Sequence, residues 1–156
     1  SGGVVDVESG ASLKIAGTTM SATAAELNLL SSADRAIKVE KQTLAAVSSA
    51  GGVLAWANPT AGTIVITRLV FDLTTAASGA GTVDCGVATN GTTLNDTFID
   101  GLDVNAAAGT FDNVENQGTN GVAAKKMTSS QFLTCSKASG DSAGLVGSAY
   151  IHYYAE

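Results

Sequence analysis

Charged side chains are scarce in this chain, and so are aromatic rings, proline and cysteine. Only 14% of the residues are charged and 5% are aromatic, with one proline and two cysteines in 156 residues. Soluble domains usually carry about 25% charged residues, so this surface is either uncharged and polar or partly covered by another subunit. Two cysteines and one histidine are too few ligands for a structural metal site, and we expect no cofactor.

Basic residues are scarcer than acidic ones: Lys and Arg total 8 against 14 Asp and Glu, which gives a net charge of -6. Nucleic-acid binding needs a concentrated basic face, so we expect no nucleic-acid partner. No apolar run approaches the roughly 20 residues of a membrane span. The N-terminus also lacks a basic segment followed by an apolar one. We therefore expect no membrane partner and no secretion signal.

The chain does contain a series of short strand patterns, separated by loops rich in Gly, Asn, Ser and Thr. Its length and its 45% hydrophobic content allow one domain with a substantial core and a small appendage. From residue 37 onward the pattern predicts an all-β fold, a β-sandwich of about eight strands that is jelly-roll-like or a related Greek key. The expected strands are 37–47, 52–58, 63–75, 81–89, 96–104, 109–114, 125–137 and 145–154.

The segment TIVITRLVFDLTT, residues 63–75, is the best candidate for a central strand. Strict alternation places Leu69, Phe71 and Leu73 on one face. The opposite face is more apolar than a solvated surface usually is, so we expect a neighbouring subunit or a loop of the chain to cover it. That opposite face would carry Ile64, Ile66, Arg68, Val70 and Asp72.

The last predicted strand gathers rings on one face, where Tyr150, His152 and Tyr154 alternate with Ala149, Ile151 and Tyr153. An exposed aromatic stripe can stack on sugar rings, as in a carbohydrate-binding module. In a chain with so few aromatic residues, we favour rings that fill a subunit interface or cover the sheet edge. The candidate surface contacts are Trp56, Tyr150, His152 and Tyr154.

Cys85 and Cys135 form a single pair. A disulfide between them would close a loop of about 50 residues and stabilise the fold by roughly 4 kcal/mol on the chain-entropy estimate. Cys85 alternates with Val83 and Val87, which favours a small unpaired core residue. A disulfide stays the alternative.

Two motifs raise the question of chemistry. The sequence GDSAG, residues 140–144, matches the nucleophile-elbow pattern around Ser142. No helix pattern follows it, however, and no acid lies between Ser142 and His152, so we expect no enzymatic activity. A second segment could offer calcium its oxygen ligands if the chain bends sharply at residues 100–101, although a solvated loop is favoured. Those ligands would be Asp96, Asp100, Asp103 and Asn105.

The first 36 residues, which we call the leader, follow a different pattern. Apolar and polar residues alternate in two short runs around a Ser9–Gly10 turn, and T-A-A-E at residues 23–26 forms a capping box that opens a short helix. A small hairpin and a helix of under two turns cannot bury enough apolar surface to be stable alone. We therefore predict an oligomerisation or attachment segment over residues 1–36 and a β-sandwich domain over 37–156. The apolar contacts of the leader would be made by Val5, Val7, Leu13, Ile15, Leu27 and Leu30.

The leader sequence GGVVDVESGASLKIAGTTMSATAAELN resembles segments that recur in bacteriophage virion fibre and head-decoration proteins. The stretches TRLVFDLTTAASGAGTVDCGVATNGTT, FIDGLDVNAAAGTFDN and AGLVGSAYIHYYAE are similar to the β-domain that accompanies such a leader in phage and prophage structural proteins. The chain departs from the tail-fibre form, because its helix continues into LLSSAD and because it has no long coiled coil or repeat array. The resemblance implies a homotrimer in which three leaders meet around a threefold axis.

This resemblance implies a non-enzymatic virion protein, a trimeric capsid decoration or short head fibre protein assembled in the bacterial host cytoplasm. Its partners would be its own copies and the major capsid protein or another virion protein. The alternative is a receptor- or glycan-binding module of a tail fibre or adhesin, which would contact a host surface glycan. A hydrolase acting through Ser142 is a third and weaker hypothesis.

Overall fold

The computed structural model describes residues 14–16, 18–19 and 36–156. The chain divides into two compact units, Ser1–Ala33 and Asp34–Glu156. The described residues of the first unit form one antiparallel pair of short strands, β1 (Lys14–Ile15) and β2 (Thr18–Thr19). The predicted helix and the predicted apolar contacts of the leader lie outside the described residues, so both stay predictions. Those contacts are the side chains of Val5, Val7, Leu13, Ile15, Leu27 and Leu30.

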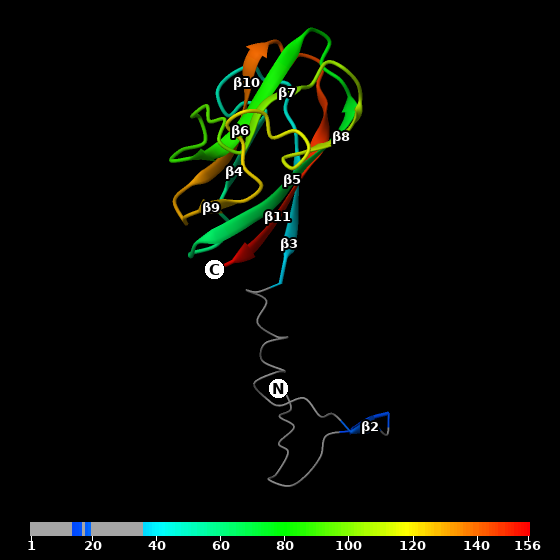
Figure 1. Ribbon diagram of the computed structural model, residues 1–156, viewed down its shortest axis with the longest axis vertical. Coiled ribbons are helices and arrows are strands. Elements are labelled where there is room, and N and C mark those ends of the chain that lie inside the picture. The colour runs from blue at the N-terminus through cyan, green and yellow to red at the C-terminus, as the bar shows by residue number, and fades with distance from the viewer. Residues whose placement is uncertain (1–13, 17, 20–35) are drawn as a thin grey trace, which may run out of the picture. The chain divides into compact units, whose positions relative to one another are not determined.

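The described part of the second unit folds into two antiparallel sheets, which confirms the all-β prediction. The four-stranded sheet has the order β4-β10-β6-β7, and the five-stranded sheet has the order β3-β11-β5-β8 with β9 also paired to β5 (Figure 1). Within the described ranges, no helix has the length and apolar character needed to cross a membrane. The strands are β3 (Lys38–Thr43), β4 (Leu54–Ala57), β5 (Ile64–Thr75), β6 (Gly81–Ala88), β7 (Ile99–Asp103), β8 (Gly109–Asp112), β9 (Lys125–Met127), β10 (Phe132–Gly140) and β11 (Val146–Ala155).

Strand pairing is nested around the connection between β6 and β7, which pair with each other. Outside them, β5 pairs with β8, β4 pairs with β10, and β3 pairs with β11. Two further pairings, β11 with β5 and β10 with β6, join these nested pairs into the two sheets. The first strand of the unit therefore lies beside its last strand, as the cyan and red strands of Figure 1 show.

The hydrophobic core lies between the two sheets. From the five-stranded sheet, Phe71 and Ile151 are fully buried, and from the four-stranded sheet Val83 and Leu133 are fully buried, all in one contiguous cluster. Each of these side chains points inward from its strand. The two sheets therefore form a sandwich that is held together mainly by apolar contact.

Trp56 belongs to this core. It is 7% exposed, because the alternation of β4 turns Leu54 and Trp56 inward while Ala55 and Ala57 face solvent. Its ring centroid lies 5.4 Å from that of Tyr153 on the opposite sheet. The prediction that Trp56 contacts a partner at the surface is therefore wrong.

The central strand β5 changes the face it presents part of the way along. Arg68 pairs with His152 of β11, but Ile66 pairs with the next residue of β11, so Thr67 is an extra residue and forms a β-bulge. A bulge reverses the alternation of the strand. Ile64 and Ile66 are fully buried as a result. The prediction that these two residues lie on the outer face with Arg68 is wrong.

The predicted strand 125–137 is two strands in different sheets. β9 pairs with β5, whereas β10 pairs with β4 and β6. A tight turn separates them, in which Gln131 N donates to Thr128 O at 3.0 Å and Thr128 N donates to Gln131 Oε1 at 2.8 Å. The sandwich over residues 36–156 therefore has nine strands instead of the expected eight.

Candidate interaction surface

Strand β3 turns its apolar side chains away from the sandwich. Val39 is 51% exposed, and Ile37 immediately before the strand is 63% exposed. Lys38, Glu40 and Gln42 are half-buried on the other side of the strand. They lie on the core side, because their partners in β11 are the buried residues at positions 153, 151 and 149. This distribution is the reverse of what a solvated edge strand normally shows.

The neighbouring strand β11 places three rings on the same side as Val39. Tyr150, His152 and Tyr154 are half-buried, while the alternating positions 149, 151 and 153 are fully or almost fully buried. This confirms the alternation predicted from the sequence. Val39 pairs directly with His152, so the exposed apolar side chain and the ring are neighbours across the two strands.

We use the name outer face for the solvent side of β3, β11 and the second half of β5. Its apolar and ring side chains come from three hydrogen-bonded neighbouring strands. The sequence pointed to the part on β11 and to Val70, but it missed the part on β3. Alternation of Ile37 and Val39 with charged residues was visible, although it does not say which side of the strand faces the core. The members of the outer face are Ile37, Val39, Val70, Tyr150, His152 and Tyr154.

Several charged groups on and beside this face have partners within the chain. The Lys41 ammonium lies 5.6 Å from the ring centroid of Tyr150. Arg68 donates from Nε to Asp112 Oδ2 at 3.0 Å and also from Nη2. Lys126 forms an ion pair with Glu156.

Asp112 is the most buried of these charged groups, with its side chain 7% exposed. Burial raises the pKa of this carboxyl. Hydrogen bonds from the backbone N–H of Glu115, from the Arg68 guanidinium and from the backbone N–H of Val114 lower it by more, so the pKa lies below the usual 3.8. The carboxylate is therefore anchored to a turn of its own strand end and to the central strand.

Ser142 does not have the surroundings of a catalytic serine. It is fully buried, and its hydroxyl lies 3.1 Å from the hydroxyl of Ser48. The loop that carries it leads into strand β11 where a nucleophile elbow would lead into a helix. Neighbouring Asp141 accepts hydrogen bonds from Ala143 N at 2.9 Å and from Ser48 Oγ at 2.9 Å. These contacts fix the loop between β10 and β11.

The four residues considered for calcium are engaged in hydrogen bonds within the chain. Asp103 Oδ1 accepts from the backbone N–H of Asn105 and of Ala106, at 2.9 and 3.1 Å, in a local turn. Asp96 and Asp100 both accept from Asn120, through its side chain and its backbone N–H respectively. Among the described residues, no group of three or more His, Cys, Asp or Glu side chains could hold a metal ion.

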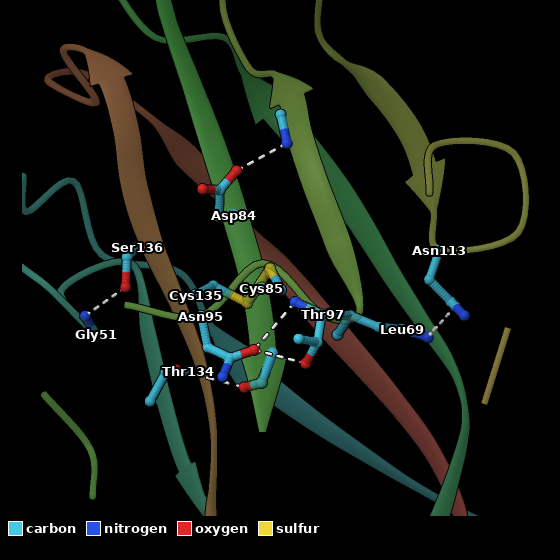
Figure 2. The surroundings of a disulfide bond; sticks show 12 residues. Gly51, Leu69, Asp84, Cys85, Asn95, Thr97, Asn113, Thr134, Cys135 and Ser136 are labelled. Carbon is cyan, nitrogen blue, oxygen red and sulfur yellow. Dashed lines mark hydrogen bonds between the residues drawn. A yellow bond between two sulfur atoms is a disulfide. The ribbon is translucent and has the colours of Figure 1, made fainter. Parts of the chain in front are cut away.

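Cys85 and Cys135 are opposite one another on β6 and β10, the two central strands of the four-stranded sheet, and the structure joins them in a disulfide (Figure 2). Their Cα atoms are 4.2 Å apart and both residues are fully buried. From the sequence we favoured unpaired core cysteines, with the disulfide as the alternative. The alternation of Val83, Cys85 and Val87 places Cys85 in the core correctly, but it carries no information about the strand that lies beside it.

Asp84, which precedes Cys85 in the chain, accepts a backbone hydrogen bond from β7 where the register of the sheet shifts. Its Oδ1 accepts from Gly101 N at 2.8 Å, where the pairing of β6 with β7 shifts register and Gly101 has φ of 81° (Figure 2). Burial raises the pKa of this carboxyl above the usual 3.8, and the nearby charges of Asp100 and Asp96 raise it further. The hydrogen bond from Gly101 offsets only part of this.

Comparison with known proteins adds one likeness of fold. A chain from the capsid of Ralstonia phage GP4 aligns with 80% of this chain and with 88% of its own length, at 14% sequence identity and a TM-score of 0.46. No family model and no curated protein matches the chain. A likeness at this level leaves the function to be argued from the residues of the chain.

Proposed function

We propose that this chain is a structural, non-enzymatic component of a bacteriophage virion, and more narrowly a trimeric capsid decoration or short head fibre protein. The observation that carries the proposal is the division into a short leader and a separately packed sandwich. The described residues of the sandwich form one hydrophobic core of their own. The resemblance of the leader to segments of virion fibre and decoration proteins supports this reading.

The residues that were considered as catalytic or calcium-binding candidates, and the two cysteines, have contacts that support a structural role. Ser142 is buried in a loop hydrogen bond with Ser48, and Asp103 closes a local turn. Cys85 and Cys135 are joined to one another in the core. Each of these groups is used to hold the sandwich together.

We further propose that the sandwich is a jelly roll. Counting β3 to β8 as strands one to six, and β10 and β11 as seven and eight, the pairs are one with eight, two with seven, three with six and four with five. Such nested pairing is what results when one long antiparallel ribbon wraps into two sheets, and two Greek keys describe it. The short strand β9 is an addition between six and seven. Sandwiches of this kind are frequent among capsid proteins.

In this proposal the leader binds the other two copies through its apolar residues and attaches the trimer to the major capsid protein or another virion protein. Assembly would take place in the cytoplasm of the bacterial host. Binding needs only complementary shape and apolar contact, because burial of apolar surface is the main source of association free energy. The leader residues assigned to this contact are Val5, Val7, Leu13, Ile15, Leu27 and Leu30.

A receptor-binding module remains the second candidate, on the specific observation that Tyr150 and Tyr154 are only half-buried on the outer face. Because Trp56 is buried in the core, its ring is not available to stack on a sugar. A decoration protein and an adhesin differ in abundance and in affinity. We expect many copies per particle and no binding to host polysaccharide for the first, and few copies with measurable glycan binding for the second.

Quantitative mass spectrometry of purified particles, with the major capsid protein as internal reference, tests the proposal directly. A decoration protein gives a copy number in a fixed ratio to the capsid protein. A trimer gives three times the 15.5 kDa chain mass by light scattering of the purified protein. A copy number of a few per particle, together with retention on a column of host polysaccharide, would replace the decoration proposal with the adhesin.

A further inference from the structure

The outer face has its polarity inverted along β3, and this inversion needs a cause. Val39 is 51% exposed while Lys38 and Glu40 take the half-buried positions on the core side. On most strands with one solvated face, the apolar side chains are the buried ones and the charged side chains are the exposed ones. We propose that a second copy of this chain covers the outer face, an inference that rests on the proposed trimer and names the surface by which its sandwich domains pack.

Charge on and beside the outer face favours a second copy over a charged partner. The face and its border carry three cationic and three anionic side chains, so they are neutral, although the whole chain has a net charge of -6. Two copies of an acidic chain repel one another in general, and they repel least where each surface is locally neutral. Most of these charges are already paired within the chain, so a partner needs to supply no counter-charge. The six are Lys41, Arg68, Lys126, Asp72, Asp112 and Glu156.

The position of β3 in the chain favours a second copy as well. Only residues 34–37 separate the first compact unit from β3. If three leaders associate, three copies of β3 are held at high effective concentration by these short tethers. A weak apolar contact at Ile37 and Val39 then becomes effectively intramolecular, so it forms without large affinity of its own.

The outer face also suits a second copy by its make-up. Tyrosine rings are enriched in the cores of interfaces, and charged side chains are depleted there. Tyr150, Tyr154 and Val39 supply rings and one aliphatic side chain, and the cationic groups of Arg68 and Lys41 lie among them. The face therefore combines apolar and ring side chains with two cationic groups that have partners within the chain.

Two matched valines allow the inference to be tested on the full chain. Val39 lies on the outer face at 51% exposure, and Val114 lies in the turn after β8 at 56% exposure. The test introduces one cysteine at a time, as Val39→Cys or Val114→Cys, and measures the rate of alkylation by iodoacetamide. Because both native cysteines are in the buried disulfide, the wild-type protein gives the background rate.

We expect the cysteine at position 39 to react about tenfold or more slowly than the cysteine at position 114, since thiol reactivity requires access to solvent. Equal rates in a protein of trimer mass would overturn this inference and leave the proposed trimer intact. A protein of monomer mass would overturn both. Protection of position 39 that appears only on assembled particles would also overturn it, because the occupant would then be another virion protein.

A charged substitution provides a second and independent measurement. Val39→Lys adds a charge to the part of the outer face on β3, whereas Val114→Lys adds the same charge in the turn after β8. Both positions are exposed in the single chain, so both variants should fold with unchanged circular dichroism. We expect Val39→Lys to raise the concentration at which the trimer dissociates by about tenfold or more, and Val114→Lys to leave it unchanged. An equal dissociation profile for the two variants overturns the inference.

Discussion

Arg68 and Asp112 pair across β5 and β8 with very different surroundings, the Arg68 side chain being 52% exposed and the Asp112 side chain 7% exposed. The buried partner also accepts backbone hydrogen bonds from Val114 N at 2.7 Å and Glu115 N at 2.9 Å. We therefore expect this carboxylate to stabilise the fold by more than a typical surface ion pair does. It ties the end of β8 to the central strand.

We expect Asp112→Asn to lower the free energy of unfolding by about 1–3 kcal/mol, because an amide cannot accept all of these hydrogen bonds as a carboxylate does. Asp72→Asn, which changes a carboxylate on β5, is the matched control and should change the free energy of unfolding little. The pKa of Asp112 is lowered, so its stabilisation is present above 3.8 and is lost as the pH falls through the lower folded value. Urea unfolding between pH 2 and pH 7 measures both effects. A variant with the wild-type acid profile would contradict this account.

Asp84 should have the opposite influence on pH dependence. Its pKa is raised in the folded state, so its protonated form favours folding below 3.8 and that contribution is lost as the pH rises through the raised value. Asp84→Asn keeps an oxygen to accept the hydrogen bond from Gly101 N and cannot ionise. We expect the variant to gain stability relative to wild type as the pH increases above 4. Thermal unfolding of the two proteins at a series of pH values shows this, and parallel curves would refute it.

The disulfide should contribute measurably to stability. It joins residues 50 positions apart, so the chain-entropy model gives about 4 kcal/mol for the loss of this restraint in the unfolded state. Protein unfolded and refolded with a reductant keeps both sulfur atoms and lacks only the bond. Guanidinium unfolding of the oxidised and reduced forms therefore isolates the contribution of the bond. Two reactive thiols in the unfolded protein without any reductant would show that the bond does not form.

Trp56 should behave as a core residue. Trp56→Ala removes a ring that packs against Tyr153, and we expect a loss of about 3–5 kcal/mol in the free energy of unfolding. Leu94→Ala, at a position 48% exposed, is the control and should change it by about 0.5 kcal/mol or less. Tryptophan emission of the native protein gives a separate reading, because a buried indole emits at shorter wavelength than a solvated one. Similar losses for both variants would contradict the core assignment.

The sequence predicted those parts of the fold in which alternation continues unbroken. In β11, Tyr150 and His152 fall on one face and Ile151 on the other, as period-two alternation requires. In β5 the same reasoning fails at Thr67, because a bulge adds a residue that leaves no mark in the hydrophobic pattern. Local alternation tells which residues share a face, but register shifts depend on the neighbouring strand.

Alternation within one segment also cannot predict which residue lies opposite on the neighbouring strand. Cys85 was correctly placed in the core, yet its bond to Cys135 depends on β6 lying beside β10. Trp56 was a candidate surface contact, and a strand as short as β4 has too few residues for its alternation to show which side is buried. Ile37 and Val39 could be read as an alternating pair, and only the pairing of β3 with β11 shows that they face away from the core. The outer face is thus a property of tertiary structure.

The nested pairing of the strands sets the order in which this chain can mature on the ribosome. β3 takes its place in the sheet only beside β11, so the first strand of the sandwich waits until Ala155 has been synthesised. Contacts this distant in sequence are slow to form. In the proposed trimer, leaders of neighbouring nascent chains would then be able to associate while their sandwich domains are still incomplete.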